Sequence, residues 1–276
     1  MVEIFGKTKK KHGLKARYGV VTHIEHIDDA FVRVRIEGDE LADLPVQGPS
    51  DHFKLVLPHK DREQIEYDPH TCKLGSQEIS RDLTAMKVLP TGIEIDIAKH
   101  ADGELAQWLT RFSSDSDNKD FAHSAHVLLL GPKSSIVLPP VEQILIAVDH
   151  SAFPALTRWL DHLDDNAHID VVLITTWDGV QRYFHKHWTR SNVTFHIIEP
   201  DYSGETLLDL IKSLPLEADQ YVWLAGEAST LIPARKWLRN ESGIPKENMK
   251  IDGYWKHGVA GRSHHDPIDP NEPELG

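Results

Sequence analysis

The second half of the chain alternates bare apolar segments with amphipathic ones, and this alternation restricts the possible folds most. Residues 144–148 and 221–225 are compact apolar segments, with further strand candidates at 169–175 and 193–198. Strands covered on both faces show such near-continuous apolar runs. Between them, leucines and aromatics recur at helical spacing, as at 156–163 and 207–214. Strands alternating with helices predict a doubly wound, mostly parallel α/β sheet.

The segment 221–258 is expected to carry the ligand-facing turns of this sheet. After the strand at Tyr221, residues 226–228 turn the chain into a helix, for which Ser229 or Thr230 is the expected N-cap. We place Pro233 in the first turn of that helix, where its missing N–H costs little. The run 250–255 then returns to the sheet and ends in a turn at 256–258. Ligands of open α/β sheets bind beyond the carboxyl ends of the strands, so both turns should face one.

The first half of the chain has a different pattern, with short strands and turns. Residues 31–37 alternate strictly between apolar and arginine side chains, and 93–97 alternate isoleucine with acidic residues. Further strands are expected at 52–58 and 127–131, with one helix near 103–112. Short alternating strands of this kind indicate a small antiparallel β-barrel.

Composition shifts divide the chain into four parts. We expect a basic N-terminal arm at 1–14, the β-barrel domain at 15–140 and the α/β domain at 141–262. The remaining segment, 263–276, is rich in proline and acidic residues and is expected to be disordered.

Charge and cysteine content narrow the function. The formal net charge of -13 argues against nucleic-acid binding, and no apolar run is long enough to cross a membrane. The single cysteine, Cys72, allows no internal disulfide and fits a reducing, cytoplasmic compartment. The histidine pairs His185/His187 and His264/His265 lack a second pair at zinc-site spacing, so no metal site is expected.

Six short stretches of the chain together match the motifs of one known family, and they occur in the same order as in that family. They are 52–58 (HFKLVLP), 81–84 (RDLT), 100–103 (HADG) with a tryptophan at 108, 131–134 (GPKS), 222–228 (VWLAGEA) and 253–258 (GYWKHG). Through them the chain resembles the siderophore-interacting protein family, flavin-dependent ferric-siderophore reductases. The resemblance implies a flavin-binding β-barrel followed by an NAD(P)H-binding-like α/β domain.

The resemblance also implies a binding site for flavin adenine dinucleotide (FAD). In the family an arginine faces the phosphates, an aromatic ring covers the flavin and a threonine bonds its side. Carried over by motif position, the cofactor-binding residues are Arg81, Leu83, Thr84, His100, Asp102, Gly103, Trp108, Asp149, Ser151, Gly226, Glu227, Tyr254, Trp255 and Gly258.

The chain departs from the family pattern at four positions that bear on flavin binding. Leu83 stands where the family has tyrosine and Met86 where it has arginine, while Glu104 and His150 replace residues of two loops. Alone, Arg81 could be a surface ion-pair residue, Trp108 a helix-packing residue and His100 a strand-end histidine.

The substrate site implied by the resemblance rests on three lysines. Lys54, Lys133 and Lys256 match positions that hold an anionic ferric siderophore, with a catecholate chelate favoured. Lysine suits a bulky anion because its charge is compact and mobile. The alternative is that all three are ordinary surface lysines.

The expected activity is ferric-siderophore reduction, with electrons passing from NADPH, NADH or a ferredoxin through FAD to Fe(III). No acid–base catalytic residue is expected. Arg235 and Lys236 could meet the 2′-phosphate of NADPH or could be solvated helix residues, so the donor stays open. The alternatives are a flavin-free member that binds a ligand or partner, and a flavin reductase for another acceptor.

Overall fold

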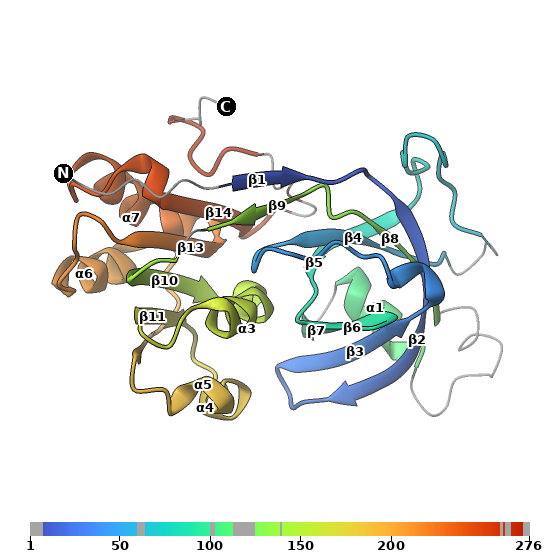
Figure 1. Ribbon diagram of the computed structural model, residues 1–276, viewed down its shortest axis with the longest axis horizontal. Coiled ribbons are helices and arrows are strands. Elements are labelled where there is room, and N and C mark those ends of the chain that lie inside the picture. The colour runs from blue at the N-terminus through green and yellow to red at the C-terminus, as the bar shows by residue number, and fades with distance from the viewer. Residues whose placement is uncertain are drawn as a thin grey trace. The chain divides into compact units, whose positions relative to one another are not determined.

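The computed structural model describes residues 8–59, 64–99, 103–112, 125–138, 140–259, 262 and 266–272. The chain divides into two compact units, one spanning Thr8–Val137 and the other containing everything from Leu138 onward (Figure 1). None of the described helices is long and apolar enough to cross a membrane.

The first unit is built on a curled, seven-stranded antiparallel sheet in the order β5-β4-β8-β2-β3-β7-β6 (Figure 1). Its strands are β2 (Ala16–His26), β3 (Phe31–Glu37), β4 (His52–Leu57), β5 (Ile79–Thr84), β6 (Lys87–Leu89), β7 (Gly92–Ala98) and β8 (His126–Leu130). All neighbouring pairs run antiparallel. The predicted antiparallel barrel is therefore confirmed, as a strongly curled sheet.

The alternation in β3 and β7 separates a core face from a charged face. Val32, Val34 and Ile36 are buried in one apolar cluster together with the isoleucines of β7. On the other face, the guanidinium of Arg33 meets the Asp96 carboxylate at 2.8 Å, directly across the two strands. Cross-strand pairs of opposite charge stabilise a sheet, so both faces hold β3 and β7 in one register.

Part of the expected basic arm is a strand rather than a free arm. Residues Thr8–Lys11 form β1, which pairs antiparallel with β9 (Ser134–Val137) in a separate two-stranded sheet. Next to this pair, His12 Nε2 lies 2.8 Å from Ser135 Oγ, and that hydroxyl donates to the Asp51 carboxylate. The exposed lysine side chains are compatible with a strand because the backbone of β9 supplies the partner groups.

The second unit is built on a five-stranded parallel sheet in the order β12-β11-β10-β13-β14. Its strands are β10 (Gln143–Asp149), β11 (His168–Ile174), β12 (Val193–Ile198), β13 (Tyr221–Glu227) and β14 (Met249–Trp255). The helices between them are α3 (Phe153–His162), α4 (Val180–Tyr183), α5 (His185–Trp188), α6 (Glu205–Ser213) and α7 (Ala228–Asn240) (Figure 1). This confirms the predicted doubly wound α/β fold.

The start of α7 differs from the predicted one. Neither Ser229 nor Thr230 is the N-cap: the cap is Glu227, whose Oε2 accepts a hydrogen bond from the Thr230 N–H at 2.7 Å. The helix therefore begins at Ala228, and Pro233 lies inside it rather than in its first turn.

The described part of the expected disordered tail packs against the α/β unit. Ile268 is 6% exposed and joins the core that includes α7. Arg235 pairs with Glu272 at 2.8 Å, and Lys236 pairs with Asp269 at 3.0 Å. A buried apolar side chain and two ion pairs hold residues 266–272, so disorder is wrong for this stretch.

Candidate functional site

The parallel sheet reverses its strand order between β10 and β13. From β10 the chain proceeds to β11 and β12 on one side, and later to β13 and β14 on the other. The crevice at such a reversal, beyond the carboxyl ends of the strands, is where doubly wound folds bind ligands. Asp149 ends β10 and Glu227 ends β13, so two of the predicted site residues lie there.

The Asp149 carboxylate ties three strand ends together. One oxygen accepts from the Ser151 N–H at 2.9 Å and from the Ser151 hydroxyl at 2.5 Å. The other accepts from the Glu227 N–H and from the Trp255 indole N–H, both at 2.8 Å. A carboxylate has about four acceptor positions, and all are occupied here. The structure therefore gives Asp149 a positioning role in place of the direct cofactor contact that we expected.

Gly226 is required by the close approach of that carboxylate. Its φ is +154°, a conformation that residues with a side chain rarely adopt. A Cβ atom at this position would lie 2.6 Å from Asp149 Oδ2. The absence of a side chain at Gly226 thus lets the end of β13 lie in close contact with the Asp149 carboxylate.

Glu227 joins the turn after β14 to the start of α7. Besides capping the helix, its Oε1 accepts a hydrogen bond from the His257 N–H at 3.1 Å. The residue is only 4% exposed, and its carboxylate oxygens accept hydrogen bonds from within the protein. It shapes the 256–258 turn, which ends at the exposed Gly258 with φ +74°.

Aromatic side chains gather beside this turn. The Tyr202 ring lies 4.7 Å from the His257 ring and meets the Trp255 indole edge-on at 6.4 Å, measured between centroids. Burial, together with the nearby Asp252 and Asp149 carboxylates, raises the pKa of Tyr254 well above its usual value. Tyr254 is therefore a neutral phenol at physiological pH.

In the first unit, the predicted Arg81, Leu83 and Thr84 all lie on β5. Arg81 is half-buried, and its guanidinium donates to the Ser80 carbonyl at 2.8 Å. Among the described residues, no carboxylate pairs with it, which disfavours the surface ion-pair interpretation. Leu83 packs against the core cluster, beside Phe53 of β4.

The second stretch expected to bind flavin is only partly described. His100 and Asp102 lie outside the described residues, whereas Gly103 is the N-cap of α1 (Glu104–Thr110). Trp108 is 1% exposed and meets Phe112 edge-on at 5.2 Å within the core. A side chain so completely buried offers a cofactor no surface. The structure thus supports helix packing for Trp108 and not the expected cofactor contact.

The three candidate lysines differ in their surroundings. Lys54 donates to both carboxylate oxygens of Asp82, at 2.9 and 3.0 Å, so its charge is already paired. Lys133 is exposed and follows the end of β8, whose Leu130 pairs with Lys54 across to β4. Lys256 follows β14 in the α/β unit. The first two therefore lie near the same ends of the neighbouring strands β4 and β8.

The residues proposed for a 2′-phosphate are committed elsewhere. Arg235 is 1% exposed and holds Glu272, while Lys236 holds Asp269. Neither points to a nucleotide site. No group of three or more His, Cys, Asp or Glu side chains in the described part of the chain is arranged to hold a metal ion.

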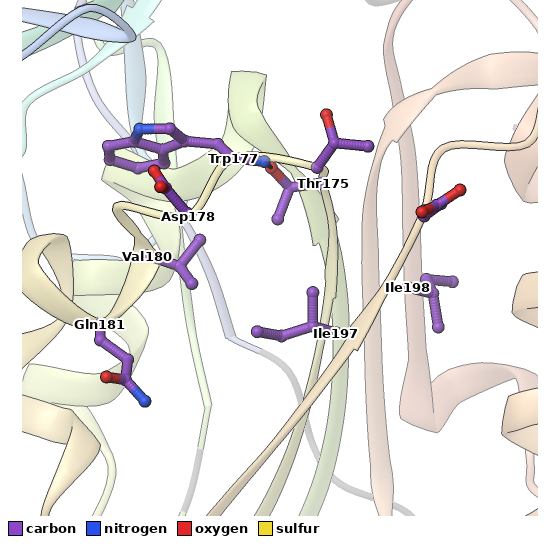
Figure 2. Close-up of a pocket in the computed structure, with 9 residues that line it drawn as sticks. Thr175, Trp177, Asp178, Val180, Gln181, Ile197 and Ile198 are labelled. Atoms are coloured by element: carbon purple, nitrogen blue, oxygen red, sulfur yellow. Dashed lines mark hydrogen bonds between the residues drawn. The ribbon is translucent and has the colours of Figure 1, made fainter.

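A cavity that our sequence reasoning missed opens beyond the carboxyl ends of β11 and β12 (Figure 2). It has a volume of about 390 Å³ and is lined by Thr175, Thr176, Trp177, Asp178, Val180, Gln181, Ile197, Ile198 and Glu199. His150, one of the departures from the family pattern, borders it through a 2.5 Å hydrogen bond to Thr175 Oγ1. The same strand-end rule that singled out residues 226–228 could have identified residues 175–178.

Comparison with known proteins places the α/β half in a family. Residues 141–258 match the family model described as "Siderophore-interacting protein". This match covers the whole parallel sheet and ends at the turn after β14. The match confirms the resemblance inferred from the short motifs, and it covers the carboxyl-edge turns described above.

The similarity to known proteins extends over both units. It is 21% identical to the ferric vibriobactin reductase ViuB of Vibrio cholerae serotype O1 over 88% of this chain and 90% of that protein. A siderophore utilization protein from T. fusca superposes with a TM-score of 0.78, at 21% identity over 94% of this chain and 100% of that one.

A third comparison concerns a ferredoxin reductase of the same fold. A ferredoxin NADP+ reductase from Neisseria gonorrhoeae, solved with bound FAD and NADP, superposes with a TM-score of 0.56. Identity is 9% over 87% of this chain and 99% of that one, so the likeness concerns the fold alone. The curled antiparallel sheet joined to a parallel sheet is thus the ferredoxin-reductase-like arrangement.

Proposed function

We propose that this protein is an FAD-dependent ferric-siderophore reductase, taking electrons from a reduced nicotinamide or a ferredoxin. The observation that carries the proposal is the similarity to a ferric vibriobactin reductase across 88% of this chain and 90% of that protein, which spans both units. Fold alone would not supply a function. A reducing cytoplasmic compartment is part of the same proposal.

The donor set on β5 fits a bound flavin dinucleotide. A pyrophosphate needs a cation and hydrogen-bond donors, and Arg81 offers a guanidinium that bonds only a backbone carbonyl among the described residues. The Thr84 hydroxyl, half-buried at the end of the strand, has no hydrogen bond within the described part of the chain. Both groups are therefore available to a ligand. When bound, FAD supplies a redox centre that accepts an electron pair and releases electrons singly.

The chain's own residues hold and orient. Arg81 would meet phosphate charge and Thr84 would bond the edge of the ring, while the part of Leu83 left exposed by the core would cover a face without the stacking of an aromatic side chain. In the α/β unit, the Asp149 hydrogen bonds keep Trp255 and the 226–228 turn in place, which preserves the shape of the carboxyl edge. Positioning of donor, flavin and acceptor is then the main catalytic contribution.

The proposed substrate is an anionic ferric chelate, preferably a catecholate. The net charge of -13 repels anions unless a local positive site gathers them. Lys133 and Lys256 have no carboxylate partner among the described residues and are the stronger candidates, whereas Asp82 already neutralises Lys54. Reduction to Fe(II), a weaker partner for hard oxygen ligands, would release the iron.

One observation favours a second candidate, a flavin-free member that only binds its ligand. Leu83 packs against the core where the family carries a flavin-covering tyrosine, and Trp108 is fully buried. A flavin reductase for another acceptor would keep the cofactor and lose the siderophore.

A reconstitution experiment separates these functions. The apo-protein is titrated with FAD while quenching of flavin fluorescence is followed. The bound flavin is then reduced under argon with a stoichiometric amount of dithionite, and a ferric catecholate chelate is added. Reoxidation of the flavin, together with capture of Fe(II) by a ferrous indicator, is the expected result. Failure to bind FAD at micromolar concentration would favour the binding module. Bound flavin that reduces a quinone but no ferric chelate would favour another acceptor.

A further inference from the structure

The cavity beyond β11 and β12 occupies a defined place in the doubly wound sheet. In chain order β10, β11 and β12 are the first three strands of the α/β unit, and the cavity lies at the carboxyl ends of the second and third. In doubly wound dinucleotide-binding folds, an acidic residue beyond the second strand bonds the ribose 2′-hydroxyl of NAD, whereas an arginine there accommodates the 2′-phosphate of NADP. The side chains of this cavity can therefore be compared with those two chemistries.

The cavity lining carries acidic side chains, as in the folds that bind NAD. Asp178 follows β11 and Glu199 follows β12, and both line the cavity. Neither carboxylate has a hydrogen-bond or ion-pair partner among residues 8–59, 64–99, 103–112, 125–138 and 140–259. The lining includes no lysine or arginine among these residues. Arg182 follows Gln181 on α4 but is not part of the lining.

The remaining lining suits an adenosine. Val180 and Ile197 give the cavity apolar lining, and Figure 2 shows both on the same side of β12, whereas Ile198 lies on the other side of that strand. Ile197 is exposed, at 51% of its surface, although it lies in β12 of the parallel sheet. A flat apolar base would cover this side chain, with the ribose directed toward the carboxylates. Ligand pockets are typically apolar with few polar groups that fix orientation.

We propose that this cavity binds the adenosine half of NADH, and that Asp178 and Glu199 select NADH against NADPH. The inference rests on the proposed use of a nicotinamide donor and adds which one. Each carboxylate can accept a hydrogen bond from a ribose hydroxyl. A 2′-phosphate would bring about two negative charges to the same place, where no lining cation offsets them. Repulsion between like charges then excludes NADPH, and this is specificity through an unfavourable contact.

Nucleotide fragments test the selection without the flavin. Calorimetric titration of the purified full chain with 5′-AMP and with adenosine 2′,5′-bisphosphate should show tighter binding of 5′-AMP, by at least about tenfold. Asp178→Asn combined with Glu199→Gln should reduce that ratio by about tenfold, because both amides keep the shape and remove the charge. The matched control, Asp209→Asn with Glu217→Gln, removes two exposed charges of the same unit outside the cavity and should leave the ratio unchanged.

Three results would overturn the proposal: equal or tighter binding of the bisphosphate, a ratio that the double variant leaves intact, or no binding of either fragment at millimolar concentration. None of these would remove the proposed reductase function, because flavin reduced by dithionite can be tested on a ferric chelate without any nucleotide. Conversely, selective binding of 5′-AMP by a chain that reduces no ferric chelate would uphold the selection and reject the siderophore.

Discussion

Removing the Asp149 carboxylate should destabilise the α/β unit by about 3 kcal/mol. Two of its four hydrogen bonds, from the Glu227 N–H and the Trp255 indole, join separate strand ends and have no local substitute. A hydrogen bond to a charged group contributes about 1.5–3 kcal/mol, and the lower part of that range applies because the site is half-exposed. The two bonds from Ser151 are local, and water can replace them at little cost.

Gly226→Ala provides the second arm of a double-mutant cycle. The new Cβ would lie 2.6 Å from Asp149 Oδ2, and φ +154° is itself strained for alanine. Together these should cost about 2–4 kcal/mol. In the Asp149→Ala background the steric conflict disappears and only the backbone strain of about 1–2 kcal/mol remains. The two substitutions should therefore be non-additive by about 1–2 kcal/mol.

Urea unfolding followed by tryptophan emission is a suitable assay, because only Trp108 of the seven tryptophans precedes residue 138, so the signal reports mainly on the α/β unit. Asp209→Ala, an exposed change on α6, serves as the control and should shift stability by less than about 0.5 kcal/mol. A loss below about 1 kcal/mol for Asp149→Ala, or equal costs of Gly226→Ala in both backgrounds, would refute the hub role of this carboxylate.

Three further outcomes are expected. Burial, which outweighs the nearby Asp161, lowers the pKa of His187 below its usual 6.5. The stability present above 6.5 is therefore lost as pH falls from 6.5 through the lowered pKa of the folded protein. His187→Leu should flatten this acid-side decline in the urea midpoint, and a parallel decline would contradict it. Leu83→Tyr should tighten FAD binding by about 0.5–1.5 kcal/mol in a fluorescence titration, through ring stacking; an unchanged dissociation constant would argue against a flavin at β5. Lys256→Ala should weaken binding of a ferric catecholate more than Lys54→Ala at low salt, and the reverse order would exclude Lys256 from the site.

The local sequence pattern was sufficient to predict a strand where burial of one or both of its faces determines the residues it contains. The strict alternation at 31–37 predicted β3 at its observed bounds, and the bare apolar run at 144–148 predicted the centre of β10. Pattern failed where a distant partner decides. The lysine-rich β1 is a strand only because β9 supplies its hydrogen-bond partners, and residues 266–272 are ordered by contacts with α7.

The site residues were harder to interpret, because a motif position does not reveal how a side chain's bonding capacity is used. Asp149 was predicted to bind the cofactor, whereas its four hydrogen bonds are all internal. Similarly, nothing near Lys54 in the sequence shows that Asp82, on the neighbouring strand, neutralises it. Asp178 drew no attention, since an acidic residue after a strand is common and its cavity forms only when β11 and β12 lie side by side.

The carboxyl edge of the parallel sheet thus contains two differently built parts. Around β10, β13 and β14, the carboxylates of Asp149 and Glu227 are filled by internal donors and fix the backbone. Around β11 and β12, Asp178 and Glu199 face a cavity with their acceptor capacity unused by the described residues. A ligand can use hydrogen-bond acceptors that face a cavity and have no partner in the protein. Acceptors that are already bonded within the protein make the backbone rigid instead. Substitutions in the first part should therefore change stability and all ligands together, and those in the second should change nucleotide selection while stability stays constant.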